Sequence, residues 1–158
     1  MSVECFLDTN VLVYAVSSLP ADSTKQQTAL DLIQHADFGL SAQVLQELYV
    51  NVTRKISKPL PPDEAVALLE ELRCFPLVPT DYPLVVTGVE TSLRYGISYW
   101  DGAIIAAADR LGAETLYTED LSDGQLYGSV RAVNPFLRGT GDSSVHEPGA
   151  RTYRGYAG

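Results

Sequence analysis

The sequence predicts an α/β fold in which a mostly parallel sheet is flanked by helices. Short apolar runs with the length of buried strands alternate along the chain with longer segments of helical spacing. Such alternation is typical of successive strand–helix units that build a parallel sheet. The length of 158 residues corresponds to one domain with a hydrophobic core of its own.

The first strand and helix are expected within residues 5–15. An apolar run ends at Asp8, two small polar residues follow, and a second apolar run begins at Val11. This pattern indicates a buried strand that turns directly into a helix, with Asp8 at the corner. Ligands of open α/β sheets bind at the carboxyl ends of the strands, so the first strand places a carboxylate where a site can form.

A second helix and a second strand are expected next. Residues 23–26 (Ser-Thr-Lys-Gln) have the form of a capping box and predict a helix over about residues 24–36. Residues 38–41 predict a short strand, and Ser41 can cap the helix that follows it.

The helix expected over about residues 42–57 has an apolar and a polar face. Its polar residues recur every three or four positions and form a stripe: Gln43, Glu47, Asn51, Arg54 and Lys58. A solvated helix face is the plainest explanation of this stripe. Contact with a ligand is the alternative.

The second half of the chain is expected to contain three more helices and three more strands. The helices are predicted over about residues 62–75, 80–95 and 98–111, and the strands over residues 77–78, 114–118 and 130–133. Two prolines open the first of these helices, and Gly96 and Gly112 end the other two.

The helix over residues 98–111 is expected to be buried at the centre of the domain. Residues 103–108 (Ala-Ile-Ile-Ala-Ala-Ala) leave it no polar face over its middle. Asp101 is one helical step from Ile104 and Ala108, so its side chain is expected to point inward.

The charge balance restricts how the chain can contact nucleic acid. A net charge of −9 argues against broad attraction to phosphates, which depends on Lys and Arg. It leaves room for a nucleic-acid enzyme, because carboxylates that bind divalent ions are counted as bare negative charge. The one tight basic group is Arg54, Lys55 and Lys58.

A cytoplasmic protein without a membrane segment is the simplest expectation. No apolar run approaches the roughly 18 residues that a membrane span needs, and no basic region precedes the first apolar segment. Cys5 and Cys74 form neither a disulfide framework nor a zinc set. Both are expected to be small core residues in a reducing compartment.

Four acidic residues are expected to meet at one edge of the sheet: Asp8, Glu47, Asp101 and Asp120. Each also has a plainer explanation. Asp8 can cap a helix, Asp101 can belong to a capping box with Ser98, and Asp120 can be a turn residue. These explanations are less satisfactory for the four acids taken together. An inward-facing Asp101 needs a partner, and no Lys or Arg lies near Asp101 or Asp8 in sequence.

A divalent cation shared among these carboxylates is the most direct solution. Oxygen ligands from Asp and Glu select hard ions such as Mg²⁺ or Mn²⁺. Such ions support displacement at phosphorus by activating a water and by neutralising charge on the leaving oxygen. Thr9 can orient one of the carboxylates. The stripe of Gln43, Asn51, Arg54 and Lys58 would then extend from the metal along a phosphate backbone.

Other chemistries find little support in the sequence. It contains no Gly-rich phosphate loop, no Gly-x-Ser-x-Gly motif and no His near a candidate nucleophile. A phosphatase is disfavoured because residues 8–10 lack an Asp-x-Asp pattern. A module that binds RNA or protein without cutting it is the remaining alternative, although it would not need all four acids.

The assembled motifs resemble the PIN-domain family and, within it, VapC-type toxins of bacterial toxin–antitoxin pairs. The matching segments occur in family order over about residues 3–136: residues 7–12, 41–47, 98–101 and 116–120. The resemblance implies an α/β/α sandwich around a parallel sheet and a ribonuclease that depends on Mg²⁺ or Mn²⁺.

The resemblance also implies roles for single residues and partners. The acidic quartet would be Asp8, Glu47, Asp101 and Asp120, with Asp123 as an alternative or additional fourth acid. Thr9 and Asn10 would support Asp8. Toxins of this family commonly form homodimers and are held inactive by a cognate antitoxin, while RNA is the substrate.

The end of the chain differs in character from the rest. From Gly139 onward Gly, Ser, Thr, His and Pro occur without periodicity. We therefore expect a nuclease domain over residues 1–138 and a flexible tail over residues 139–158.

Overall fold

A computed structural model describes residues 2–137, so the predicted tail and the domain boundary before it lie outside the described residues. The centre is a six-stranded sheet with the strand order β3-β2-β1-β4-β6-β5. The strands are β1 (Cys5–Leu7), β2 (Phe38–Ser41), β3 (Leu77–Val78), β4 (Thr115–Tyr117), β5 (Leu126–Tyr127) and β6 (Val130–Val133). All neighbours pair in parallel except β5 and β6, which are antiparallel.

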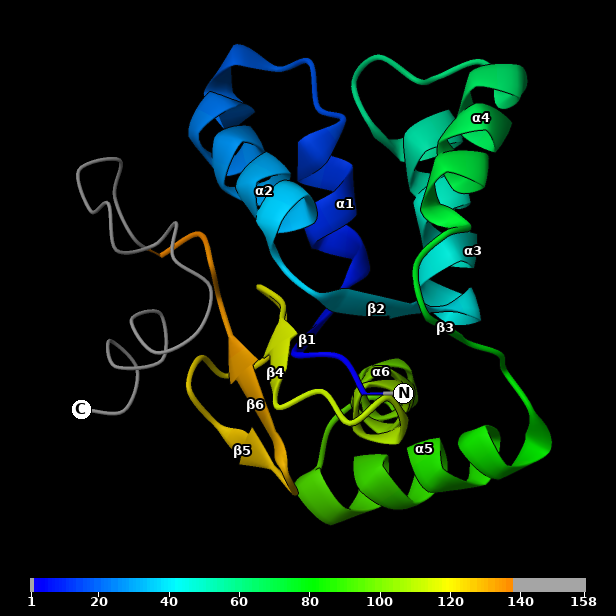
Figure 1. Cartoon of the computed structure of the whole chain (residues 1–158), viewed down its shortest axis with the longest axis vertical. Coiled ribbons are helices and arrows are strands. Elements are labelled where there is room, and N and C mark those ends of the chain that lie inside the picture. The colour runs from blue at the N-terminus through cyan, green and yellow to red at the C-terminus, as the bar shows by residue number, and fades with distance from the viewer. Residues whose placement is uncertain (1, 138–158) are drawn as a thin grey trace.

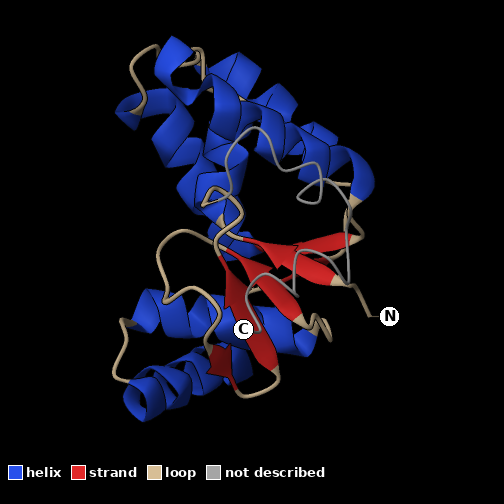
Figure 2. Cartoon of the chain, turned by 90° about the vertical axis from the view of Figure 1, so that its left-hand side faces the viewer, coloured by secondary structure: helices blue, strands red, loops and turns tan. Residues whose placement is uncertain are grey.

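Helices cover both faces of this sheet, which makes the three-layer α/β/α arrangement (Figures 1 and 2). One side carries α1 (Thr9–Ala15), α2 (Ser23–His35), α3 (Ala42–Val50) and α4 (Pro62–Leu72), and the other carries α5 (Tyr82–Tyr95) and α6 (Tyr99–Arg110). The predicted α/β fold with a mostly parallel sheet is therefore confirmed. No helix within residues 2–137 has the length and apolarity to cross a membrane.

The core forms where the central strands meet α6. Residues 102–108 of α6 are all buried, as the absence of a polar face predicted. All three residues of β1 and all three of β4 are buried as well, as expected of central strands covered on both faces. The carboxyl ends of β1 and β4 are therefore held in place by a well-packed core.

Two glycines let α5 and α6 approach closely. A Cβ atom on Gly102 would lie 2.5 Å from the carbonyl oxygen of Gly88 and 2.9 Å from the backbone nitrogen of Ser92. A larger residue at either glycine would push the helices apart. Gly102 directly follows Asp101, so this contact also fixes where that carboxylate lies.

Helix α2 starts differently from the prediction. A 3₁₀ turn (Pro20–Asp22) leads into it, and its N-cap residue is Asp22, which makes no side-chain capping hydrogen bond. The capping box predicted at residues 23–26 is therefore wrong. The carboxylate of Asp22 instead accepts a hydrogen bond of 2.7 Å from the hydroxyl of Ser17.

The helix predicted over residues 42–57 is shorter and changes type. Helix α3 ends at Val50, and a π-helical segment (Asn51–Lys55) continues it before the chain becomes irregular. Lys58 therefore lies beyond the helix. Cys5 is buried as predicted, but Cys74 is exposed, so its expected place in the core is wrong. Strand β5, which has only two residues, was not predicted from the sequence.

Candidate active site

Asp8 lies at the end of β1 and is only 5% exposed. It caps α1, because its Oδ1 accepts the backbone N–H of Thr9 at 2.7 Å, and its Oδ2 accepts the hydroxyl of Thr118 at 2.8 Å. Burial raises the pKa of Asp8 to about 7, although both hydrogen bonds favour the ionised form. The charges of Asp120 and Glu47 raise this pKa further. Capping and a place in the acidic cluster are thus combined in one residue.

Glu47, on α3, is held from two sides. The hydroxyl of Thr9 donates to its Oε2 at 2.9 Å, and Nε2 of Gln43 donates to its Oε1 at 2.8 Å. Thr9 therefore contacts two of the predicted acids, Asp8 through its backbone and Glu47 through its side chain. Both oxygens of Glu47 are oriented before any ligand arrives.

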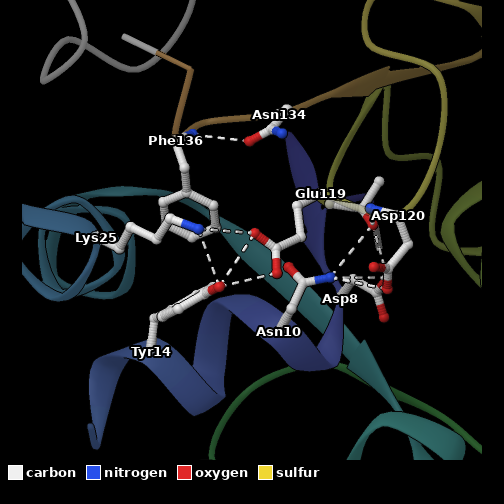
Figure 3. A network of polar contacts seen from close by, with 9 residues as sticks. Asp8, Asn10, Tyr14, Lys25, Glu119, Asp120, Asn134 and Phe136 are labelled. Atoms are coloured by element: carbon white, nitrogen blue, oxygen red, sulfur yellow. Dashed lines mark hydrogen bonds and ion pairs between the residues drawn. The ribbon is translucent and has the colours of Figure 1, made fainter. Parts of the chain in front are cut away.

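Asn10 bridges the ends of β1 and β4 (Figure 3). Its Nδ2 donates to Oδ2 of Asp120 at 3.1 Å and lies 3.5 Å from Oδ2 of Asp8. The hydroxyl of Thr118 accepts the backbone N–H of Asp120 at 3.1 Å. Within residues 2–137, Oδ1 of Asn10 is buried without a hydrogen-bond partner. An amide thus separates two carboxylates and leaves one oxygen unused.

Asp101 occupies the first turn of α6 and is half-buried. Its backbone N–H donates to the hydroxyl of Ser98 at 3.1 Å, so the expected capping interaction is present. Burial raises the pKa of Asp101, and the charges of Asp120 and Glu47 raise it further. Glu47 and Asp120 are therefore close enough to influence both Asp8 and Asp101.

Within the described part of the chain, no cationic side chain forms an ion pair with the acidic quartet. The three ion pairs found within residues 2–137 are Lys25–Glu119, Arg73–Glu70 and Arg110–Asp81, and none involves a quartet member. In the same part of the chain, no three Asp, Glu, His or Cys side chains form a ready-made metal site. Two of the acids, Glu47 and Asp120, line a cavity of about 300 Å³ together with Asn10.

The donor set fits a hard divalent cation. Its members offer carboxylate oxygens, and burial raises the pKa values of Asp8 and Asp101, whereas Asn10 presents its Nδ2 rather than its oxygen to Asp8 and Asp120. Because the carboxylates are not yet close enough to form a complete site, an ion would have to draw them together. Such an ion would remove the electrostatic cost that raises the pKa values of Asp8 and Asp101.

A second polar cluster lies beside the quartet and joins α1, α2 and the loop after β4 (Figure 3). Lys25 donates to the hydroxyl of Tyr14 at 3.0 Å and to Oε2 of Glu119 at 3.3 Å, and Tyr14 donates to Oε1 of Glu119 at 3.0 Å. The ammonium also lies over the rings of Tyr14 and Phe136. Glu119 precedes Asp120, so this cluster anchors the loop that carries the fourth acid.

Asp123 has a different environment from the quartet. Its Oδ1 accepts the backbone N–H of Asn134 at 2.8 Å. This bond ties the loop between β4 and β5 to the chain after β6. The geometry therefore associates Asp120, rather than Asp123, with the other three acids.

The predicted polar stripe is only partly brought to the acids. The side chain of Gln43 donates to the carboxylate of Glu47 at 2.8 Å. The side chain of Asn51 donates to the backbone carbonyl of Glu47, also at 2.8 Å. Arg54 is exposed on the π-helical segment, and Lys58 follows in irregular structure. Lys55, from the same basic group, instead lines a second cavity with Trp100.

Comparison with known families identifies the domain. The model of the PIN domain matches residues 5–122, about three quarters of the sequence. This chain belongs to the PIN domain family. The matched region contains every member of the acidic quartet, whereas Asp123 lies one residue beyond it.

Solved structures share the fold of this PIN domain at low sequence identity. VapC20 of Mycobacterium tuberculosis, described as a sarcin–ricin loop cleaving toxin, is 19% identical with a TM-score of 0.60, covering 73% of this chain and 89% of its own. A toxin–antitoxin complex from Klebsiella pneumoniae is 17% identical with a TM-score of 0.61, covering 80% and 94%. DNA-bound VapBC from Salmonella typhimurium is 18% identical with a TM-score of 0.56, covering 82% and 96%. No curated protein sequence matches the chain.

Sequence reasoning missed several residues that surround the acids of this PIN domain. Thr118 and Lys25 contact residues about a hundred positions away, and no local pattern signals such contacts. Glu119 was visible as an acid at the end of β4, but its partners on α1 and α2 were not. Trp100 was expected only as part of a helix start.

Proposed function

We propose that this PIN domain is an endoribonuclease that depends on Mg²⁺ or Mn²⁺ and acts as the toxin of a type II toxin–antitoxin pair. The observation that supports it is that the charges of Glu47 and Asp120 act on both Asp8 and Asp101, while no Lys, Arg or His within residues 2–137 forms an ion pair with any of these four acids. Burying the Asp8 carboxylate is costly, and a divalent ion shared with the other acids, of which Asp120 is exposed, would compensate for that cost.

The metal would be held by the acidic quartet of Asp8, Glu47, Asp101 and Asp120. A bound divalent ion supplies an activated water for attack at phosphorus and offsets charge on the leaving oxygen. The chain itself orients the carboxylates. Thr9, Thr118 and Asn10 donate hydrogen bonds to them and limit the directions in which their oxygens point.

RNA contacts are proposed for Gln43, Asn51, Arg54 and Lys58. Gln43 and Asn51 lie beside Glu47, while Arg54 and Lys58 are exposed on the continuation of the same segment. These cationic side chains, further along the segment from Glu47, would receive phosphates of the RNA backbone.

The biological setting is proposed from the kinship of the fold. Structures with this fold include a toxin that cleaves the sarcin–ricin loop and toxin–antitoxin complexes. We infer that this chain also forms a homodimer in the cytoplasm and is inhibited by a cognate antitoxin. Co-expression with the product of a neighbouring small reading frame should then relieve growth arrest caused by this chain.

Cleavage of RNA by the purified chain tests the proposed activity. Hydrolysis is expected with Mg²⁺ or Mn²⁺, is expected to stop with chelator, and is expected to fall by at least about a hundredfold in Asp8→Asn and Asp101→Asn. Glu90→Gln, an exposed acid on α5, is the matched control and should retain activity. If Asp8→Asn and Asp101→Asn both cleave RNA as fast as the unaltered chain, the assigned site is wrong.

A catalytically inactive binding module is the second candidate. It is favoured by the lack of a ready-made three-ligand metal site within residues 2–137. If that candidate is right, the chain binds RNA or protein, yet no divalent ion produces cleavage across varied RNA substrates. A comparison of Asp120→Asn with Asp123→Asn decides which residue is the fourth acid, because only the substitution of the true metal ligand should weaken Mn²⁺ binding.

A further inference from the structure

A second cavity adjoins the candidate active site and has not been assigned a role. It has a volume of about 350 Å³, and its lining includes Trp100, Val50, Gln46 and Lys55. We call it the Trp100 pocket. Glu47 and Asn51 line both this pocket and the cavity beside Asp120, so the two spaces are neighbours on either side of Glu47.

Trp100 is exposed close to the start of a helix whose middle is buried. Its side chain is 64% exposed, although residues 102–108 of the same helix are buried. The ring of Tyr99 packs against the indole edge-on, with centroids 5.1 Å apart. Val50, across the pocket, is 42% exposed. A large aromatic surface is thus held in place and open to solvent.

The pocket is coupled to the acids by one side chain. Nε2 of Gln43 donates both to Oε1 of Glu47 at 2.8 Å and to the backbone carbonyl of Trp100 at 3.2 Å. Gln43 is itself buried, so this link is shielded from water. Trp100 also directly precedes Asp101. A molecule that rests on the indole therefore has a fixed position relative to two members of the quartet.

The charge of the chain favours recognition through bases over recognition through phosphates. The net charge is −9, and the one tight basic group has only three residues, Arg54, Lys55 and Lys58. Broad neutralisation of a phosphate backbone is thus not available to this surface. Sequence-tolerant affinity for single strands comes instead from bases that stack on aromatic rings.

We propose that the Trp100 pocket binds one unpaired nucleobase of the RNA substrate, stacked on the indole, next to the phosphodiester that the quartet cleaves. The amide groups of Gln46 and Asn51 can pair with the edge of the base, and Lys55 meets an adjoining phosphate. This inference rests on the proposed function and adds a requirement for an unpaired base beside the cleaved bond.

Binding can be followed directly, because Trp100 is the only tryptophan in the sequence. The inactive Asp101→Asn variant is titrated with single-stranded oligoribonucleotides of about six nucleotides, and an end-labelled copy reports binding independently by anisotropy. We expect saturable quenching of the indole fluorescence by an oligonucleotide with bases and none by an abasic ribose-phosphate oligomer. Binding seen by anisotropy without quenching would overturn the proposal and leave the proposed nuclease function standing.

Cleavage kinetics provide the second readout. Trp100→Ala is expected to raise KM for single-stranded RNA by about 5- to 100-fold with a smaller change in kcat, and Trp100→Phe is expected to recover most of the loss. Tyr82→Ala is the control, because Tyr82 is 80% exposed at the far end of the α5–α6 pair. Unchanged KM in Trp100→Ala would contradict the nucleobase site, whereas absence of cleavage by the unaltered chain would contradict the nuclease function.

Other occupants of the pocket give distinct results. If a second copy of this chain covers the indole, the free protein will show protection from iodide quenching that disappears on dilution, and oligonucleotides will not compete. That outcome would overturn the proposal. Accessibility of the indole at all concentrations, combined with quenching by bases, supports it.

Discussion

Asp8 bears the largest electrostatic cost among the residues of the candidate site. Its carboxylate is buried at the end of β1, and burial raises its pKa from the usual 3.8 to about 7. Two hydrogen bonds lower the cost, but the neighbouring acids add to it. Without a cation, ionisation of Asp8 therefore opposes folding.

The pH dependence of stability should reveal this cost. Because the folded pKa of Asp8 is higher than the unfolded one, the metal-free chain loses stability as pH rises from about 4 through about 7. Asp8→Asn removes this contribution, so at about pH 8 it should be more stable than the unaltered chain by about 1 to 4 kcal/mol. Urea unfolding with chelator at several pH values measures the difference. If the free energies of unfolding of the unaltered chain and of Asp8→Asn change with pH in parallel, the prediction is wrong.

Thr118 should tune the affinity of the site for metal. Its hydroxyl is the side-chain donor closest to Asp8, at 2.8 Å, and Thr118→Val removes that donor with little change of shape. Mn²⁺ affinity is expected to fall by about 10- to 100-fold, as for other residues that orient ligands. Calorimetric titration measures the affinity. Thr118→Ser retains the hydroxyl and should bind Mn²⁺ nearly as well as the unaltered chain.

At the scale of elements, short sequence patterns predicted those helices and turns that depend on neighbouring residues alone. The corner at Asp8 and the buried helix α6 follow from short runs of apolar and polar residues, and the structure contains both. The capping box of α2, the π-helical end of α3 and strand β5 did not follow. At the start of α2, Asp22 bonds to Ser17 rather than capping the helix, and the two residues of β5 are a strand only because they pair with β6.

The close contact of α5 and α6 is expected to be intolerant of an added methyl group. Gly102→Ala places a Cβ 2.5 Å from a backbone oxygen and should cost about 1 to 3 kcal/mol in free energy of unfolding. Gly88→Ala is the graded comparison, because its Cβ would meet Ala103 at the longer distances of 3.1 and 3.2 Å. Thermal and urea unfolding measure both. A milder effect at Gly102 than at Gly88 would contradict the packing argument.

The Lys25 cluster is expected to contribute more than an ordinary surface ion pair. Lys25 joins α2 to the loop after β4, and it also contacts the Tyr14 and Phe136 rings. After allowance for its 40% exposed side chain, Lys25→Met should cost about 1 kcal/mol. Arg73→Met is the control, because the Arg73–Glu70 pair is far more exposed and should contribute almost nothing. Equal melting temperatures for the two variants would count against this role.

At the scale of the whole molecule, the acidic charge should make stability depend on divalent cations. A ligand that binds only the folded state stabilises it by RT ln(1 + [L]/Kd), about 2.7 kcal/mol at a hundredfold excess over Kd. Mg²⁺ is therefore expected to raise the melting temperature by about 5–10 °C. Sodium chloride at equal ionic strength controls for general screening. The same rise in a variant that combines Asp8→Asn with Asp101→Asn would show that the ion binds elsewhere.

The sequence predicted the participants of the candidate site better than their arrangement. Asp8 and Asp120 follow strands and Asp101 lies in the first turn of α6, and such positions can be recognised from local patterns, whereas Glu47 lies within α3. The bonds that orient them cannot, since Thr9 reaches Glu47 across 38 positions and Thr118 reaches Asp8 across 110. The Trp100 pocket depends on the same long-range packing of α3 against the start of α6.

The two outermost strands of the sheet, β3 and β5, contain only two residues each. An extended peptide or a misfolded neighbour that docks along either margin finds backbone groups for no more than a few hydrogen bonds. Within the described part of the chain, the sheet therefore offers a poor template for growth into fibres. A chain with this architecture should remain dispersed when it accumulates, and its associations should depend on side-chain surfaces rather than on strand addition.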